Sequence, residues 1–233
     1  MKTISQEVKL PIIEIPTNET NGDVLARRRH GPLFPTSIRA IICGPSNCGK
    51  TNALLNMIYN PNGLAFENIY LYSKSRYQPK YQELEQVLAK CPEIGFFPFD
   101  DNDSVIPPND AKQNSVFIFD DVACEKQDHI RSYFCMGRHK NIDSLYLTQT
   151  YTRIPKHLIR DNANFLVLFR QDDMNLKHIY NDHVNTDMIF NTFRDICAYC
   201  WNSGKYGCII IDKTSDINNG RYRKGFDEYI IVE

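Results

Sequence analysis

The loop at residues 44–51, GPSNCGKT, constrains this chain more than any other stretch. It matches the pattern G-x-x-x-x-G-K-[ST], the phosphate-binding P-loop. A short apolar run of strand type, residues 38–43, comes before the loop, and the helix-compatible residues 52–59 come after it. This order of strand, loop and helix brings backbone N–H groups and the positive end of a helix dipole to one concavity. The stretch therefore predicts a binding site for nucleotide phosphates.

Individual residues of the loop have separate roles in such a site. Gly44 and Gly49 allow the backbone to curl without Cβ clashes. Lys50 can reach the β- and γ-phosphates, and the Thr51 hydroxyl can ligate Mg²⁺. The residues that we expect to contact the nucleotide are Gly44, Pro45, Ser46, Asn47, Cys48, Gly49, Lys50, Thr51 and Asn52.

A second element, SVFIFDD at residues 115–121, is an apolar run of buried-strand type that ends in two acids. It has the form of a Walker B strand. In P-loop enzymes the first acid helps to hold Mg²⁺. A second acid beside it can orient or deprotonate the attacking water. We therefore assign Asp120 to the metal and Asp121 to the water.

Apolar runs alternate with helical patterns along the chain, which is typical of an α/β fold with a mainly parallel sheet flanked by helices. Some runs are continuously apolar, as expected for central strands that are buried on both faces. These central strands are residues 38–43, 116–120, 144–148 and 165–169. Ligands on open α/β sheets bind outside the carboxyl ends of the strands. That edge is expected to carry the P-loop, the acid pair, Gln149 and Arg170.

The remaining patterns predict peripheral elements. We expect a strand at 67–73, helices at 79–91, 125–136 and 154–159, and an irregular connection at 98–114. Gly137 is interpreted as the end of the second of these helices, and Pro155 as a first-turn residue of the third. Residues 3–15 and 229–232 can pair at sheet edges.

Gln149 ends the strand that follows the acid pair in the sequence. Some P-loop ATPases have an extra strand between the P-loop strand and the Walker B strand, and a polar residue at its end can contact the γ-phosphate or the attacking water. Glutamine donates and accepts hydrogen bonds at once, which suits the orientation of a water molecule. The alternative interpretation is a residue that caps a turn at the strand end.

Composition narrows the class of protein. At 233 residues the chain suits one α/β domain with additions. Its 27 Lys and Arg residues balance 28 Asp and Glu residues, so the net charge gives no evidence for a nucleic-acid partner. The basic cluster at residues 27–30 can touch DNA phosphates or a neighbouring subunit, although a solvated loop is the favoured interpretation.

The eight cysteines fit reduced, buried thiols better than a disulfide framework. Cys197 and Cys200 have C-x₂-C spacing, but zinc would need two further ligands, so a buried helix face is favoured. No apolar segment of signal type begins the sequence, and no run approaches membrane-spanning length. We therefore expect a protein of a reducing compartment with no membrane segment.

Several motifs occur together in a specific order. They are residues 44–51, 117–121, 137–141 (GRHKN), 144–150 (SLYLTQT), 154–162 and 165–170. In this order they resemble the FtsK/HerA superfamily of DNA-pumping ATPases, and within it the viral genome-packaging branch of poxviruses, other large DNA viruses, virophages and Polinton-type elements. The resemblance runs from about residue 38 to residue 182. It divides the chain into an N-terminal extension (1–35), a P-loop ATPase core (36–185) and a C-terminal addition of helix and strand to the same domain (186–233).

The resemblance implies a RecA-like core that hydrolyses ATP with Mg²⁺. It implies a homo-oligomeric ring, a pentamer or hexamer, around double-stranded DNA, which translocates that DNA into a capsid and contacts capsid proteins. The corresponding location is the host cell cytoplasm, in a virus factory, or the nucleus, with association to the virion as a further option. The acid pair here is Asp-Asp, whereas many superfamily members have Asp-Glu, so the resemblance supports the role of Asp120 more directly than that of Asp121.

The resemblance also singles out Arg138. In FtsK-type motors an arginine shortly before the Gln-bearing strand serves the neighbouring active site, and Arg138 holds that motif position. The competing interpretation of Arg138 is a cation at a helix C-terminus that complements the helix dipole. Arg160 and Arg170 are reserve candidates for the same catalytic role.

Two other functions are compatible with a P-loop, namely a nucleotide-dependent switch without DNA-pumping activity and a small-molecule kinase. A GTP switch needs a guanine-reading N-K-x-D motif after a strand, and the sequence contains none. A kinase needs an arginine-rich lid and an acceptor pocket, and the acid pair with the later Gln149 strand argues against it. Stimulation of hydrolysis by double-stranded DNA separates these classes from a DNA motor.

Overall fold

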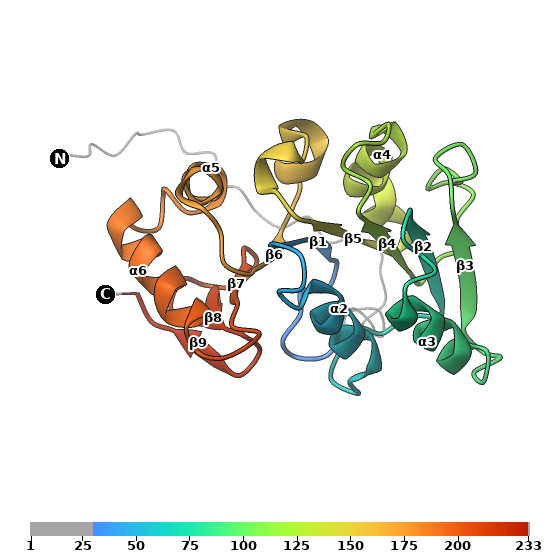
Figure 1. Cartoon of the computed structure of the whole chain (residues 1–233), viewed down its shortest axis with the longest axis horizontal. Coiled ribbons are helices and arrows are strands. Elements are labelled where there is room, and N and C mark those ends of the chain that lie inside the picture. The colour runs from blue at the N-terminus through green and yellow to red at the C-terminus, as the bar shows by residue number, and fades with distance from the viewer. Residues whose placement is uncertain (1–29, 233) are drawn as a thin grey trace, which may run out of the picture.

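The computed structural model describes residues 30–232, and within them nine strands form one sheet in the order β3-β2-β4-β5-β1-β6-β7-β8-β9 (Figure 1). The parallel strands are β1 (Arg39–Cys43), β2 (Asn68–Ser73), β3 (Gly95–Phe99), β4 (Ser115–Asp120), β5 (Ile142–Thr148) and β6 (Phe165–Leu168). The strands added in antiparallel fashion are β7 (Ile209–Asp212), β8 (Tyr222–Lys224) and β9 (Glu228–Ile230). The predicted α/β class with a mainly parallel sheet is confirmed.

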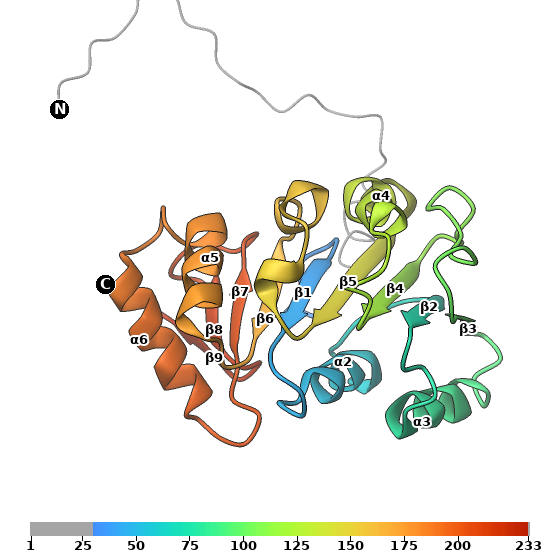
Figure 2. The same ribbon diagram turned by 45° about the horizontal axis from the view of Figure 1, so that its top comes forward.

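Helices cover both faces of the sheet, which explains why its central strands are apolar along their whole length (Figure 2). On one face lie α2 (Lys50–Tyr59) and α3 (Pro79–Leu88). On the other face lie α4 (Asp128–Met136), α5 (Asp173–His183) and α6 (Phe190–Trp201). Each face buries its own hydrophobic cluster, and the strands contribute alternate side chains to the two clusters.

Strand β4 shows how this alternation works. Val116 and Ile118 pack toward α2 and α3, while Phe117 and Phe119 pack toward α4. The Phe117 ring lies 5.3 Å from the ring of Tyr70 and 4.3 Å from that of Tyr133, between centroids. This aromatic stack joins the Walker B strand to its neighbour β2 and to α4, and so helps to fix the position of Asp120 at the end of the strand.

The strand order confirms the four predicted central strands and places β5 between β1 and β4. In the parallel register Thr148 lies beside Cys43, and Leu147 lies beside Asp120. The ends of the three strands are therefore level with one another. The P-loop, the acid pair and Gln149 each begin at this common edge, because each directly follows its strand in the sequence.

Strand β3 was not predicted, since its last residues fall in the expected irregular connection at 98–114. Pro98 cannot donate to a sheet, but β3 is an edge strand and needs hydrogen bonds on one side only. The Phe97 and Phe99 rings stack on Tyr70, which supplies the apolar contact that holds the strand.

The α-helix ends at Met136 with Gly137 as its C-cap residue, as predicted, but Gly137 does not reverse the chain. It keeps right-handed dihedral angles (φ −52, ψ −40) and opens a 3₁₀ turn, Gly137–Lys140. Asn141 reverses the chain instead, with φ 52, because asparagine also tolerates the left-handed conformation. Gly137 is small for a different reason: a Cβ there would lie 2.9 Å from the carbonyl oxygen of Ile142.

The short helix predicted at 154–159 is not formed as a regular helix. The chain forms an irregular turn at Lys156–Arg160, in which Leu158 has φ 70. Arg160 is drawn inward by an ion pair with Asp182 (2.8 Å) and lies over the Tyr151 ring. These tertiary contacts override the local helix preference.

The ends of the chain complete the comparison with the sequence. The predicted pairing of residues 229–232 at an edge is confirmed by β9, whereas the edge strand expected at 3–15 and Arg27, Arg28 and Arg29 lie outside the described residues. His30 is buried, accepts a hydrogen bond from the Ala65 N–H and pairs with Asp143, so it does not belong to a solvated loop. Between residues 30 and 232 no helix combines the length and the apolar character that a bilayer crossing requires.

The aromatic stack generates a stability prediction. Phe117→Ala should lower the free energy of unfolding by about 3–5 kcal/mol, since it deletes a fully buried ring from a packed cluster. Tyr229→Ala, on the exposed edge strand β9, is the matched aromatic control and should change it by less than about 0.5 kcal/mol. Urea unfolding of both variants measures the difference. Equal losses would show that the stack does not support the sheet.

Candidate nucleotide-binding site

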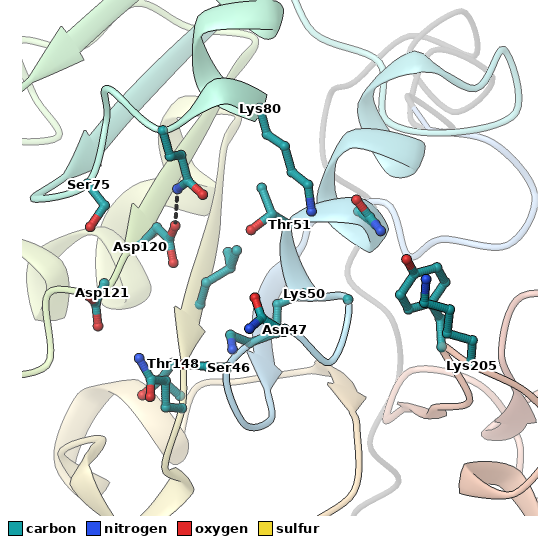
Figure 3. A pocket seen from close by; sticks show the side chains of 16 residues that line it. Ser46, Asn47, Lys50, Thr51, Ser75, Lys80, Asp120, Asp121, Thr148 and Lys205 are labelled. Carbon is teal, nitrogen blue, oxygen red and sulfur yellow. Dashed lines mark hydrogen bonds between the residues drawn. The ribbon is translucent and has the colours of Figure 1, made fainter.

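A cavity of about 460 Å³ opens at the carboxyl ends of β1, β4 and β5 (Figure 3). Most of the predicted site residues line it, although they come from three separate parts of the chain. They are Ser46, Asn47, Gly49, Lys50, Thr51, Asn52, Asp120, Asp121 and Gln149. Of the predicted nucleotide contacts, Gly44, Pro45 and Cys48 belong to the same loop and shape it without lining the cavity.

The P-loop owes its shape to close packing beneath its glycines. A Cβ on Gly44 would lie 2.5 Å from the Cβ of Phe169, and one on Gly49 would lie 3.3 Å from the Phe169 ring. Gly49 also has φ 115, a conformation that side chains other than glycine rarely adopt. Phe169 is itself buried at the end of β6. The loop is therefore pressed onto the sheet, and its path is set by the strand beside it.

Lys50 is held inside the loop by the loop's own backbone. Its Nζ donates to the carbonyl oxygen of Gly44 (2.7 Å) and to that of Pro45 (2.9 Å). A phosphate oxygen would compete with these carbonyls for the same ammonium group, and its negative charge adds a Coulombic attraction that a neutral carbonyl lacks. The lysine is thus positioned to exchange neutral acceptors for phosphate.

Asp120 combines burial with a donor that holds it. The Tyr81 hydroxyl donates to its Oδ2 at 2.7 Å, and the Gln78 side-chain amide donates to the same oxygen at 3.4 Å. Burial is the largest influence and raises the pKa of Asp120 above its usual value, while the bond from Tyr81 opposes this rise. A divalent cation would compensate the buried negative charge. The hard oxygen ligands Thr51 and Asp120 on one cavity wall fit Mg²⁺, which binds through few protein ligands together with substrate phosphates.

Asp121 differs from Asp120 in its exposure and in its backbone conformation. It is exposed, and its backbone takes the left-handed conformation with φ 57. Aspartate tolerates this conformation better than most residues. The turn lets two consecutive side chains, Asp120 and Asp121, both face the cavity (Figure 3).

Gln149 reaches the cavity from β5. The Gly44 N–H donates to the carbonyl oxygen of Thr148 (3.2 Å), which ties the start of the P-loop to the end of this strand. The next residue, Gln149, is exposed and lines the cavity. The expectation of an extra strand carrying a polar residue between the P-loop and Walker B strands is met in its geometry. The chemical role of Gln149 stays a prediction.

Leu147 and Thr148, at the end of the predicted strand that carries Gln149, also line the cavity. Five further lining residues were not predicted, namely Ser75, Gln78, Lys80, Lys205 and Tyr206. Lys80 extends from the start of α3 toward the side of the cavity that holds Thr51 (Figure 3). Lys205 and Tyr206 come from the loop between α6 and β7, where the Lys205 ammonium lies 5.2 Å from the Tyr206 ring centroid. None of the five belongs to a recognisable motif. Only the strand topology brings them to the edge where the P-loop lies.

None of the three arginine candidates lines the nucleotide cavity. Arg138 lines a different cavity, together with Arg39 and Arg223, at the amino-terminal ends of the parallel strands. Strand β5 separates it from Gln149, a distance of roughly 20 Å at about 3.3 Å per residue. Arg160 is committed to Asp182, and Arg170 bonds the side chain of Asn202 (2.9 Å). The structure therefore does not bring Arg138 to the nucleotide cavity of the same chain.

The cysteine pair is part of the core. Cys197 and Cys200 are both free and buried on α6, as the favoured interpretation of the C-x₂-C spacing expected. Burial raises the pKa of Cys200 to about 11, so its thiol stays protonated at neutral pH.

No protein-family model matches this chain, and no curated protein matches it. Its structure is similar to that of the genome packaging NTPase B204 from Sulfolobus turreted icosahedral virus 2. The sulfate complex of B204 is 12% identical, with a TM-score of 0.55 over 77% of this chain and 93% of that chain. The AMPPCP complex is 11% identical, with a TM-score of 0.51 over 76% and 93%. At these identities the likeness establishes the fold, which is that of a P-loop NTPase.

The buried Asp120 carboxylate generates a prediction that separates stability from binding. Asp120→Asn should raise the stability of the nucleotide-free protein by about 1 kcal/mol, or about 2–4 °C in Tm, because an amide accepts from Tyr81 without a buried charge. The ionised carboxylate costs stability above its raised pKa, so the wild type should approach the variant as pH falls through that value. The variant should also lose Mg²⁺-dependent nucleotide binding.

Asp121→Asn is the matched control, because the same change is made at an exposed position whose backbone asparagine tolerates. Its Tm should stay within about 1 °C of wild type. Thermal unfolding between pH 5 and 8 tests both variants, and a destabilised Asp120→Asn would contradict this account of the site.

Proposed function

We propose that this chain is an ATP-hydrolysing motor that translocates double-stranded DNA and packages a viral or virus-like genome into a capsid. The observation that carries the proposal is the position of β5. It lies between β1 and β4 and brings Gln149 into the cavity formed by the P-loop, Asp120 and Asp121. A cavity with a phosphate cradle, a buried acid, an exposed acid and a polar strand end contains the parts that nucleotide hydrolysis needs.

The likeness to B204 supports the packaging role. That protein is a genome packaging NTPase, and it has been solved with AMPPCP, an ATP analogue, and with sulfate. This chain covers 93% of it, so the shared part is nearly its whole fold. Four of the ordered motifs of the FtsK/HerA type, residues 44–51, 117–121, 144–150 and 165–170, lie in the parallel strands or directly after them.

Each residue then has a role in hydrolysis. The backbone of residues 46–52 holds the phosphates, and Lys50 leaves its carbonyl partners to bind the β- and γ-phosphates. Thr51 and Asp120 hold Mg²⁺, which neutralises charge on the phosphate oxygens when bound. Asp121 accepts a proton from the attacking water, and Gln149 orients that water with its amide.

Arg138 acts on the neighbouring subunit in this proposal. Arg138 lies at the amino-terminal ends of the parallel strands, whereas the nucleotide cavity lies at their carboxyl ends. This position suits a residue that reaches an adjoining copy in a homo-oligomeric ring. A guanidinium brought to the γ-phosphate from outside stabilises the transition state by about 10³–10⁵-fold in rate in GTPases. Hydrolysis then depends on contact between neighbours. The ring has five or six copies, and double-stranded DNA passes through it. Capsid proteins hold the ring, which works in the host cytoplasm or nucleus or in association with the virion.

The nucleotide site is tested by Lys50→Ala. Hydrolysis should fall to background and ATP binding should weaken, because the phosphates lose the loop's only cation. Lys177→Ala, an exposed lysine on α5, is the matched control and should hydrolyse ATP as the wild type does. Phosphate release measured with and without double-stranded DNA checks both variants. Wild-type hydrolysis that does not respond to DNA would argue for a switch or kinase and against a motor.

The trans role of Arg138 is tested by mixing variants. Arg138→Ala should bind ATP normally and hydrolyse it slowly at every protein concentration. Mixing it with Lys50→Ala should restore turnover, since an intact Lys50 site then meets an intact Arg138 from its neighbour. Arg194→Ala, at an exposed position on α6, is the control and should stay fully active. Mixed oligomers confirmed by mass that show no recovery would rule out the trans role.

A further inference from the structure

A second cavity, of about 430 Å³, adjoins the phosphate cavity on the flank of α2. The two cavities share Gly49, Asn52 and Tyr206, so they adjoin at the end of the P-loop. A volume of this size is within the usual range of small-molecule sites. The second cavity contains none of the acids of the first, and most of its exposed lining is apolar.

The positions of the charged residues in the phosphate cavity indicate which end of a nucleotide faces the second cavity. Asp120 and Asp121 lie on one side of the P-loop, and Lys205 lies across the loop from them (Figure 3). The metal and the terminal phosphate belong on the side of the acids. The remainder of a nucleotide must therefore leave the loop on the side of Lys205 and Tyr206, where the second cavity opens.

Tyr206 stands at the junction between the two cavities. Its ring rests against the P-loop, because a Cβ on Gly49 would lie 2.7 Å from its Cδ1. The side chain is nevertheless 46% exposed, which leaves ring surface open to a ligand. Bases stack on such rings with about 1–3 kcal/mol each, whatever the base. An open aromatic ring beside a phosphate loop has the chemistry of a base platform.

The other walls suit the same ligand. Phe169, Phe226 and Cys208 give one apolar side. Asn52 and Asn56 lie one turn apart on α2 and give a polar side, where the Asn56 amide donates to the Asn52 carbonyl oxygen at 2.9 Å. An apolar cavity edged by side-chain amides can pack against the faces of a base and hydrogen-bond its polar edge or the ribose hydroxyls.

We propose that this second cavity binds the base and ribose of the nucleotide, with the base stacked on Tyr206. The inference rests on the proposed function and assigns its nucleoside subsite. Tyr206, Cys208 and Phe226 all follow residue 186, in the segment for which the motifs gave no role. That segment thereby becomes part of the catalytic domain's ligand site.

The experiment compares two ligands on three proteins. Wild type, Tyr206→Ala and Tyr206→Phe are titrated by calorimetry with ATP and with inorganic tripolyphosphate, both with Mg²⁺. Tyr206→Ala should bind ATP roughly 5- to 100-fold more weakly than wild type. Its affinity for tripolyphosphate, which has no base, should be unchanged. Tyr206→Phe keeps the ring and should bind both ligands as the wild type does.

Three results would overturn the inference. Wild-type affinity of Tyr206→Ala for ATP would show that no base stacks there. Equal losses for ATP and tripolyphosphate would show that the ring only supports the P-loop. Wild-type protein that binds neither ligand would overturn the proposed function as well, whereas tripolyphosphate binding with unchanged ATP affinity in Tyr206→Ala would overturn this inference alone.

Discussion

Burial of the central strands on both faces is the constraint on which the site depends. Because β1, β4 and β5 are packed from above and below, their register cannot slip without moving apolar side chains out of both clusters. The level strand ends then hold the P-loop, the acid pair and Gln149 at fixed separations, although each side chain stands on a turn. The rigid sheet sets the positions, and the turns supply the reactive groups.

The same site contains two unfavourable features that a ligand would relieve. Burial and the neighbouring Asp121 raise the pKa of Asp120, and the ammonium of Lys50 is turned back onto neutral carbonyls. Both arrangements are held by surrounding packing, through Tyr81 and through the loop's contact with Phe169. A bound Mg²⁺–nucleotide would satisfy both groups at once. Part of the folding free energy is in this way kept available for binding.

The sequence was sufficient for the residues that follow strongly patterned strands. The P-loop, Asp120, Asp121 and Gln149 could be placed because continuous apolar runs identify buried parallel strands, whose carboxyl ends meet. Local patterns failed where tertiary contact decides. Pro98 and its neighbours form an edge strand because aromatic rings hold them, and Gly137 is small because Ile142 approaches it. Lys205 and Tyr206 could not be found, since a loop more than 150 residues after the P-loop reaches it only through the added antiparallel strands.

The location of Arg138 has a consequence for symmetry. The nucleotide cavity lies at the carboxyl ends of the parallel strands and Arg138 lies at their amino-terminal ends, so an Arg138 that serves the cavity of another copy, as proposed above, joins two unlike surfaces. Copies that repeat this proposed contact around a ring meet through heterologous interfaces, with one surface of each copy against the other surface of the next. Such contacts close only through cyclic rotation, and a cyclic assembly without two-fold axes has two chemically different faces. A linear polymer threaded along its axis would meet those faces in a fixed order.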